Sequence, residues 1–192
     1  MLISRGLRLL PLVFLTACAV QDSMTPMAVP TLRGLVRGGQ QPVSGSTIQL
    51  FTVGTTGEGS PGASLLNGIV KSDASGNFSI TRTYNCPSDR SLVYLVATGG
   101  NPGLAAGTNN AALALMAALG TCKNLTNTPF LNINEVTTVA AVNALAPFMS
   151  SPTTLGSSTG NASALAAAFN LASEFANMST GTSPGVGVPT GT

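Results

Sequence analysis

The stretch Leu92-Val93-Tyr94-Leu95-Val96-Ala97-Thr98 is the most apolar strand-like run in this chain of 192 residues. A continuous apolar run, rather than an alternating one, is typical of a strand that is buried on both of its faces. We therefore expect residues 92–98 to form a central strand of a sheet, with the core of the fold built around it.

Four segments on the N-terminal side of this run also carry strand signals. Ile48 and Leu50 are two positions apart, and so are Phe78 and Ile80, so each pair lies on one face of its strand. Asp73-Ala74-Ser75-Gly76-Asn77, just before Phe78, is a strong turn signal. The expected strands cover residues 32–36, 46–53, 69–72 and 78–81.

Three of these segments carry a resemblance to a known family. They are Gly34-Leu35-Val36, Gln41-Pro42-Val43-Ser44-Gly45-Ser46-Thr47-Ile48-Gln49-Leu50 and Ser72-Asp73-Ala74-Ser75-Gly76-Asn77-Phe78. Together they resemble the carboxypeptidase regulatory-like domains, which are small β-sandwiches also compared with transthyretin. The resemblance implies an antiparallel sandwich of the Ig/transthyretin-like type over residues 32–100. The long loop over residues 54–68 departs from the compact pattern and leaves the strand count open.

After Gly100 the pattern becomes helical and rich in alanine. Asn109-Asn110 can cap a helix over residues 111–119, which Gly120 would end. This segment is apolar on all sides, so as a helix it must be buried or paired.

A second helix is expected to begin after Asn132 or Asn134. Glu135 lies in its first turn, where the helix dipole favours a carboxylate, and Pro147 kinks or ends it. Its apolar side consists of Val136, Val139, Val142, Leu145 and Met149.

A third helix opens at Asn161 or Ser163 and runs to about Met178. Its residues at helical spacing are expected to pack in the core rather than bind a ligand or lipid. These residues are Leu165, Phe169, Ala172 and Phe175.

The sequence thus predicts an α+β protein, with an N-terminal antiparallel β-sandwich followed by about three helices. The expected parts are a signal peptide over residues 1–17, a tether over 18–31, the sandwich over 32–100, an Ala-rich helical region over 101–179 and a disordered tail over 180–192.

The segment Leu15-Thr16-Ala17-Cys18 follows a short apolar core whose only preceding charges are Arg5 and Arg8. This layout resembles the lipobox of bacterial lipoproteins. The resemblance implies that Cys18 receives a diacylglyceryl group and becomes an acylated N-terminus. Two or three acyl chains would hold the protein firmly at a membrane.

Ala17-Cys18-Ala19 also fits an ordinary signal-cleavage site, and cleavage there would release a soluble protein. We favour the lipoprotein, because four positions and the upstream layout agree. The residue after Cys18 is Ala19 and not Asp, and in this the chain resembles lipoproteins of the outer membrane. We therefore expect an exported chain that is lipid-anchored to the outer membrane or the cell surface.

The charge balance changes once the signal is set aside. The full chain has 8 basic and 6 acidic residues, and Arg5 and Arg8 belong to the signal, so the mature chain is formally neutral. This removes the basic footprint expected of a nucleic-acid-binding protein. Only 7% of the residues are charged, so the surface has little electrostatic protection against association.

Cys86 and Cys122 remain once Cys18 carries lipid. An even pair in an oxidising compartment indicates a disulfide, which would stabilise the fold by about 3–4 kcal/mol. Two free thiols are the alternative. A metal site is disfavoured because the chain has no His to complete it.

The same absence of His removes the commonest general base, and the acidic residues are few and scattered. No phosphate-binding loop is present. We therefore expect no catalytic residues, no metal and no cofactor, and hence a protein that is not an enzyme.

Aromatic residues decide whether a sugar site is plausible. The chain has no Trp, and Tyr94 belongs to the apolar strand, so Tyr84 is the better candidate for a ligand contact. The sequence favours a non-catalytic structural or interaction module that contacts envelope proteins, with a carbohydrate-binding module on the cell surface as the alternative.

Overall fold

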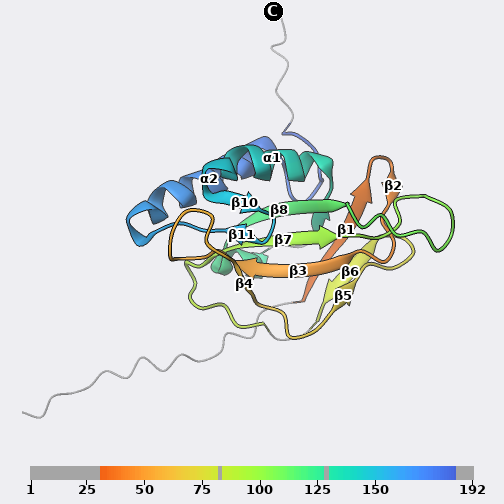
Figure 1. The fold of residues 1–192 in the computed structure, drawn as a ribbon, viewed down its shortest axis with the longest axis horizontal. Helices are drawn as coiled ribbons and strands as arrows, with labels where there is room; N and C mark the ends of the chain where they lie inside the picture. Colours follow the sequence, from red (N-terminus) through yellow and green to blue (C-terminus); the bar gives the residue numbers. More distant parts are fainter. Residues whose placement is uncertain (1–30, 82–83, 128–129, 185–192) are drawn as a thin grey trace, which may run out of the picture.

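The structure is a computed structural model that describes residues 31–81, 84–127 and 130–184 (Figure 1). The expected α+β class is confirmed. The strands are β1 (Leu32–Gly38), β2 (Gln41–Pro42), β3 (Thr47–Thr52), β4 (Ala63–Ser64), β5 (Val70–Lys71), β6 (Asn77–Ile80), β7 (Leu92–Thr98), β8 (Ala114–Thr121), β9 (Leu131–Ile133), β10 (Met149–Ser151) and β11 (Thr154–Leu155). The helices are α1 (Glu135–Leu145) and α2 (Ala162–Phe175), with short 3₁₀ turns η1 (Cys122–Asn127), η2 (Ala146–Phe148) and η3 (Thr159–Asn161).

β7 lies inside the sheet that we call the central sheet, in the order β4-β3-β7-β8 with β5 also paired to β3. It pairs antiparallel with β3 on one side and with β8 on the other. Successive residues of β7 point to opposite faces, so Leu95 enters one core and its neighbours Tyr94 and Val96 enter another. The prediction of a strand buried on both faces is confirmed, with the expected bounds.

Another sheet is formed by β1, β2, β6 and β9. We call it the first sheet, because it contains β1. β1 pairs antiparallel with β2 and β6, and parallel with β9. Gly34 permits this pairing, because a Cβ atom there would collide with the Leu131 carbonyl and the Phe78 ring. The predicted turn before β6 is closed by Asp73, whose Oδ1 accepts hydrogen bonds from the backbone N–H groups of Ser75 and Asn77, each at 2.8 Å.

The helix predicted over residues 111–119 is wrong, because residues 114–121 form β8. Leu115 and Ala117 enter the core on one face of the central sheet, whereas Met116 and Ala118 enter the core on the other. A strand with both faces buried is apolar throughout, and its sequence cannot be told from that of a buried helix by periodicity alone. The described residues therefore contain two α-helices and not three.

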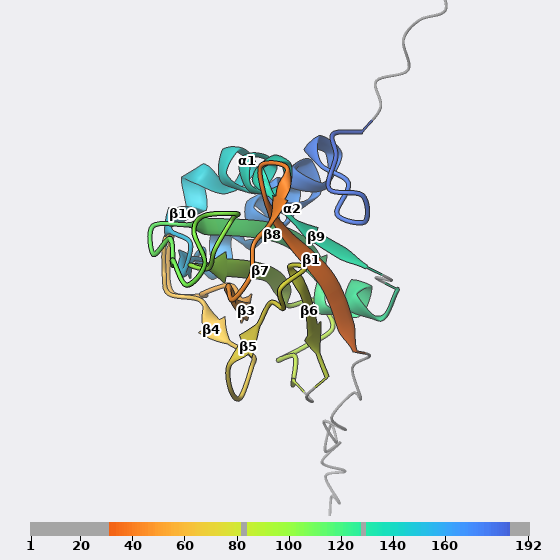
Figure 2. The same cartoon turned by 90° about the vertical axis from the view of Figure 1, so that its right-hand side faces the viewer.

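The domain consists of three layers. Side chains of the first and central sheets share the core that we call the sheet–sheet core, which includes Leu32, Ile48 and Leu95. Side chains of the central sheet and the two helices share the sheet–helix core, which includes Tyr94 and Phe169. Figures 1 and 2 show both helices together on one side of the central sheet.

Both observed helices begin where sequence signals placed them. Asn134 is the N-cap of α1, and its side chain accepts a hydrogen bond from the backbone N–H of Thr137 at 3.0 Å. The Thr137 hydroxyl closes the capping box from the other side. Asn161 precedes α2, which ends at Phe175 and so is shorter than predicted.

The predicted signal peptide, Cys18 and all of the tether except Thr31 lie outside the described residues. The start of the predicted tail is described. There the Asn134 side chain donates a hydrogen bond to the Gly181 carbonyl at 2.7 Å, and the backbone N–H of Asn177 donates one to the Thr182 carbonyl at 2.8 Å. Over the ranges that the structure describes, no helix is long and apolar enough to cross a membrane.

Candidate functional site

α1 presents its small residues to the central sheet and its valines to the surface. Of the apolar side expected from the sequence, only Leu145 is fully buried. Val136 is 38% exposed, Val139 68% and Val142 42%. The residues of α1 that are buried instead are Thr137, Ala140, Ala141, Ala144 and Leu145.

Two threonines at the start of α1 explain this orientation. β8 is the edge strand of the central sheet, and its outward backbone groups need hydrogen-bond partners. The Thr137 hydroxyl donates to the Met116 carbonyl at 3.1 Å, and the Met116 N–H donates to the Thr138 hydroxyl at 3.0 Å. These bonds fix the rotation of α1 about its axis, and the valines consequently point away from the sheet.

α2 also exposes two apolar side chains, of which Phe175 lines a groove with Val136 and Val139 of α1. The α2 residues Leu165, Phe169 and Ala172 are buried, as the sequence predicted. The prediction that Phe175 packs in the core is wrong, because its side chain is 44% exposed, and Leu171 is 40% exposed. We call the resulting surface the helical face, and it consists of Val136, Val139, Val142, Leu171 and Phe175. Contiguous exposed apolar groups of this kind are typical of interaction surfaces.

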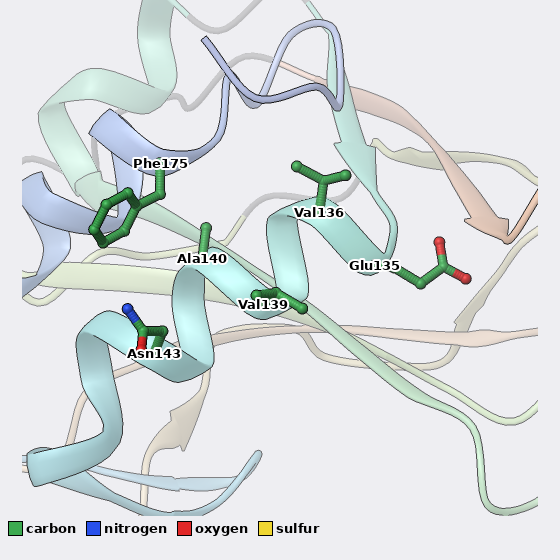
Figure 3. Close-up of a pocket in the computed structure, with 6 residues that line it drawn as sticks. All are labelled: Glu135, Val136, Val139, Ala140, Asn143 and Phe175. Carbon is green, nitrogen blue, oxygen red and sulfur yellow. The ribbon is translucent and has the colours of Figure 1, made fainter.

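A groove of about 420 Å³ lies within the helical face (Figure 3). Its walls are Val136, Val139 and Ala140 of α1 and the ring of Phe175 of α2, with Glu135 and Asn143 as its polar members. A more polar hollow of about 750 Å³ adjoins it, since Glu135 and Val136 line both.

The helices that form this face carry very little charge. α1 has one charged residue, Glu135, and α2 has one, Glu174, so both charges are acidic. The Glu135 carboxylate accepts a hydrogen bond from the backbone N–H of Gly39, which ties the start of α1 to the turn between β1 and β2. The groove follows α1 from Glu135 to Asn143, and Phe175 at the end of α2 lines it too.

The predicted disulfide between Cys86 and Cys122 is present, with the two Cα atoms 6.1 Å apart. Cys122 follows β8 directly and is fully buried against the sheet–sheet core. The bond therefore ties the segment before β7 to the end of β8.

The two tyrosines lie in different cores. Tyr84 is 1% exposed and belongs to the sheet–sheet core, so it has no free ring face on which a ligand could stack. Tyr94 belongs to the sheet–helix core, where its ring stacks on Phe51 with the centroids 5.4 Å apart. Neither hydroxyl has a hydrogen-bond partner among the described residues, and burial raises the pKa of both above its ordinary value.

The helical face was missed from the sequence because two stripes of α1 have the same spacing. Val136, Val139 and Val142 lie at helical spacing, and so does a second stripe of small residues from Thr137 to Ala144. The adjacent pair Thr137-Thr138 was the available signal, since threonine hydroxyls at a helix start can bond a neighbouring backbone.

The remaining sequence-predicted residue, Cys18, lies outside the described residues. Within the part of the chain that is described, no three His, Cys, Asp or Glu side chains are grouped so that they could hold a metal ion. Comparison of the chain with models of protein families, with curated proteins and with solved structures gave no match.

Proposed function

We propose that this chain is a non-catalytic interaction module of the bacterial envelope, held at the outer membrane or the cell surface by lipid on Cys18. The observation that carries the interaction part is the orientation of α1, which buries alanines and exposes Val136, Val139 and Val142. The lipid anchor is supported by the sequence Leu15-Thr16-Ala17-Cys18.

Val139 contributes little packing to the isolated domain, because 68% of its side chain is exposed. β-branched residues lower helix propensity, because their χ1 freedom is lost against the preceding turn. Inside a core, packing would offset this loss of helix propensity, since full burial of a valine side chain contributes about 1.5–3 kcal/mol. For Val139, most of that contribution is available only to a partner that covers the helical face.

The arrangement of the domain suits display from a membrane. β1 begins at the end of the domain away from the helices, as both ribbon views show (Figures 1 and 2). A chain tethered through the residues before Leu32 would therefore turn α1 and α2 away from its attached end. We infer further that the first and central sheets form a β-sandwich of the carboxypeptidase regulatory-like type, supported by the core that they share.

The carbohydrate-binding alternative depended on Tyr84 as a stacking platform. The buried position of this ring gives that alternative no support. We therefore base the proposed function on the helical face alone.

The anchor is tested by expressing the full chain in a double-membrane bacterium and comparing it with Cys18→Ser. We expect the parent protein in the membrane fraction with a diacylglyceryl adduct on Cys18, seen by intact mass, and Cys18→Ser in the soluble fraction. An unmodified parent protein in the soluble periplasm would refute the anchor.

The interaction surface is tested by placing a photocrosslinking amino acid at Val139 in living cells. The matched control places the same group at Ser79, which is exposed on β6 of the first sheet. We expect a discrete adduct from position 139 and none from position 79. The same adducts from both positions, or none from either, would count against a specific helical face.

A further inference from the structure

We propose that Asn67-Gly68 is a site of spontaneous covalent modification, at which the asparagine loses ammonia and becomes aspartate or isoaspartate. The pair lies in the loop between β4 and β5, where Asn67, Gly68 and Ile69 are all exposed. It is the one Asn-Gly pair in the sequence. This inference goes beyond the proposed function and depends on neither the lipid anchor nor the helical face.

The loop is fixed on both sides of the pair and open at its tip. Before the pair, the backbone N–H of Leu65 donates a hydrogen bond to the Leu50 carbonyl at 2.8 Å, and Leu65 packs against the sheet–sheet core. After the pair, Val70 is aligned with Ile48 of β3 and packs against the same core. Ile69, by contrast, is 78% exposed. The tip therefore projects into solvent while its two ends are held.

Gly68 has an ordinary structural reason to follow Asn67. Its φ angle is 124°, a conformation that residues with a side chain rarely adopt, and Asn-Gly is a common turn pair. The same lack of a side chain leaves the backbone nitrogen of Gly68 open to approach by the Asn67 amide group. A residue that suits the turn thus also favours attack on its neighbour.

Neither reacting group is held by a partner among the described residues. Within that part of the chain, the backbone N–H of Gly68 and the side chain of Asn67 make no hydrogen bond. Asn77 is a contrasting case, because its Nδ2 donates to the Asp73 carboxylate at 3.3 Å and its backbone N–H donates to the same carboxylate at 2.8 Å. Its successor Phe78 carries a side chain and belongs to β6. We therefore expect Asn67 to react and Asn77 to stay intact.

The reaction begins when the Gly68 nitrogen loses its proton and attacks Cγ of Asn67. The new N–Cγ bond closes a succinimide ring, the Cγ–Nδ2 bond breaks, and the side-chain nitrogen leaves as ammonia with the proton that Gly68 released. Water then opens the ring at one of its two carbonyls. Opening at Cγ gives aspartate, and opening at the main-chain carbon gives isoaspartate, whose backbone runs through Cβ and Cγ. The balance is one water added and one ammonia lost, with no oxidant or cofactor.

The product carries a negative charge that asparagine lacks. Without Arg5 and Arg8 the mature chain is formally neutral, so modification gives it a net charge of −1. Isoaspartate also lengthens the backbone of the tip by one carbon atom. Because the loop is held on both sides of the pair, we expect the two forms to differ in charge and at the tip, and to share the same fold.

The test incubates the full chain at neutral pH for several weeks and digests samples with trypsin. Cleavage after Arg37 and Lys71 gives a peptide over residues 38–71 in which Asn67 is the only asparagine. The next peptide, over residues 72–82, contains Asn77 as its only asparagine and is the internal control. We expect the first peptide to gain about 1 Da and to contain isoaspartate, and the second to keep its mass. A sample taken at zero time corrects for changes during digestion.

Asn67→Gln is the matched variant, because glutamine must close a larger ring and reacts far more slowly. The parent should develop the mass gain and a more acidic band in isoelectric focusing with one time course, and Asn67→Gln should develop neither. The urea-unfolded chain gives the rate of a fully open pair, and the native rate should lie within about tenfold of it. A native peptide that keeps its mass, an equal gain in the Asn77 peptide, or a native rate below this range would overturn the proposal.

Discussion

The two cores on either side of the central sheet are built from different residues. The sheet–sheet core contains large aliphatic side chains from both sheets, such as Leu32, Ile48 and Leu95. The sheet–helix core receives mostly alanine from the helices, including Ala141 and Ala144 of α1. Alanine allows the helices to approach the sheet closely, and Leu145, Leu165 and Phe169 are the larger side chains that they bury there.

This difference relates each core to the surface beyond it. The first sheet sends its large residues inward and shows polar residues such as Arg33 and Ser79 on its outer side. α1 does the reverse, since its alanines are inside and Val139 is outside. The proposed interaction surface rests on this contrast between the outer sides of the two layers.

The largest expected effect compares one substitution in the two cores. Leu95→Ala should lower the free energy of unfolding by about 4–5 kcal/mol and Leu165→Ala by about 2–3 kcal/mol, since the cost rises with the cavity that remains. Both leucines are buried, at 0% and 1% exposure. β7 is hydrogen-bonded on both sides and cannot move inward, whereas α2 can shift towards the sheet. Urea unfolding followed by circular dichroism measures both values, and equal losses would show that the cores are equally rigid.

The disulfide should be the next largest contribution, and it supports the sheet–sheet core only. We expect the double variant Cys86→Ala, Cys122→Ala to lose about 3–4 kcal/mol of unfolding free energy, as chain entropy predicts for a loop with a sequence separation of 36 residues. Reduced parent protein is the matched control and should lose the same amount. A loss confined to the alanine variant would point to packing of Cys122 rather than to the crosslink.

Much of the strand order follows from sequence pattern. β7, β3 and β6 were predicted because their apolar residues repeat at the spacing of a strand or run without interruption between turns. The turn at Asp73 was predicted because Asp side chains bond backbone N–H groups two residues ahead, as this one does. These are local rules that need no tertiary contact.

β8 and the helical face required tertiary information. Leu115 to Ala118 have side chains that are equally suited to a buried strand and a buried helix, and pairing with β7 decides between them. The rotation of α1 is decided by hydrogen bonds to Met116, 21 and 22 residues earlier in the chain. The pairing of β8 with β7 and the contact of α1 with Met116 cannot be read from the residue spacing of β8 or α1 alone.

An intermediate loss of stability should follow when a hydrogen bond between α1 and Met116 is removed. Thr138→Val keeps the shape of the side chain but leaves the Met116 N–H without its acceptor, which should cost about 1–3 kcal/mol. Thr138→Ser keeps the hydroxyl and is the matched control, with an expected loss below about 1 kcal/mol. Urea unfolding of the three proteins tests this directly. A loss equal in both variants would show that the threonine methyl group, and not the hydroxyl, holds α1 in place.

The smallest effect at neutral pH should come from the tyrosine hydroxyl that each core contains. Tyr84→Phe and Tyr94→Phe each remove a buried hydroxyl that has no partner among the described residues. Burying a polar group without a hydrogen bond is unfavourable, so each variant should match or exceed the parent stability by up to about 1 kcal/mol. The ring of Tyr94 keeps its stacking on Phe51 in the variant.

Alkaline pH separates these two variants from the parent more clearly. Burial raises the pKa of Tyr84 and Tyr94 in the folded state above the ordinary value of about 10 for an exposed tyrosine. The folded state therefore binds the phenolic protons more tightly than the unfolded state. The raised pKa values therefore stabilise the folded state fully below about pH 10. This stabilisation is lost as pH rises above that value, by up to about 1.4 kcal/mol per pH unit for each tyrosine. Each Phe variant should remove one such contribution, so urea unfolding between pH 9 and 11 should show a shallower decline in both. A shallower decline in Tyr84→Phe alone would show that the sheet–helix core opens to water at high pH while the sheet–sheet core stays closed.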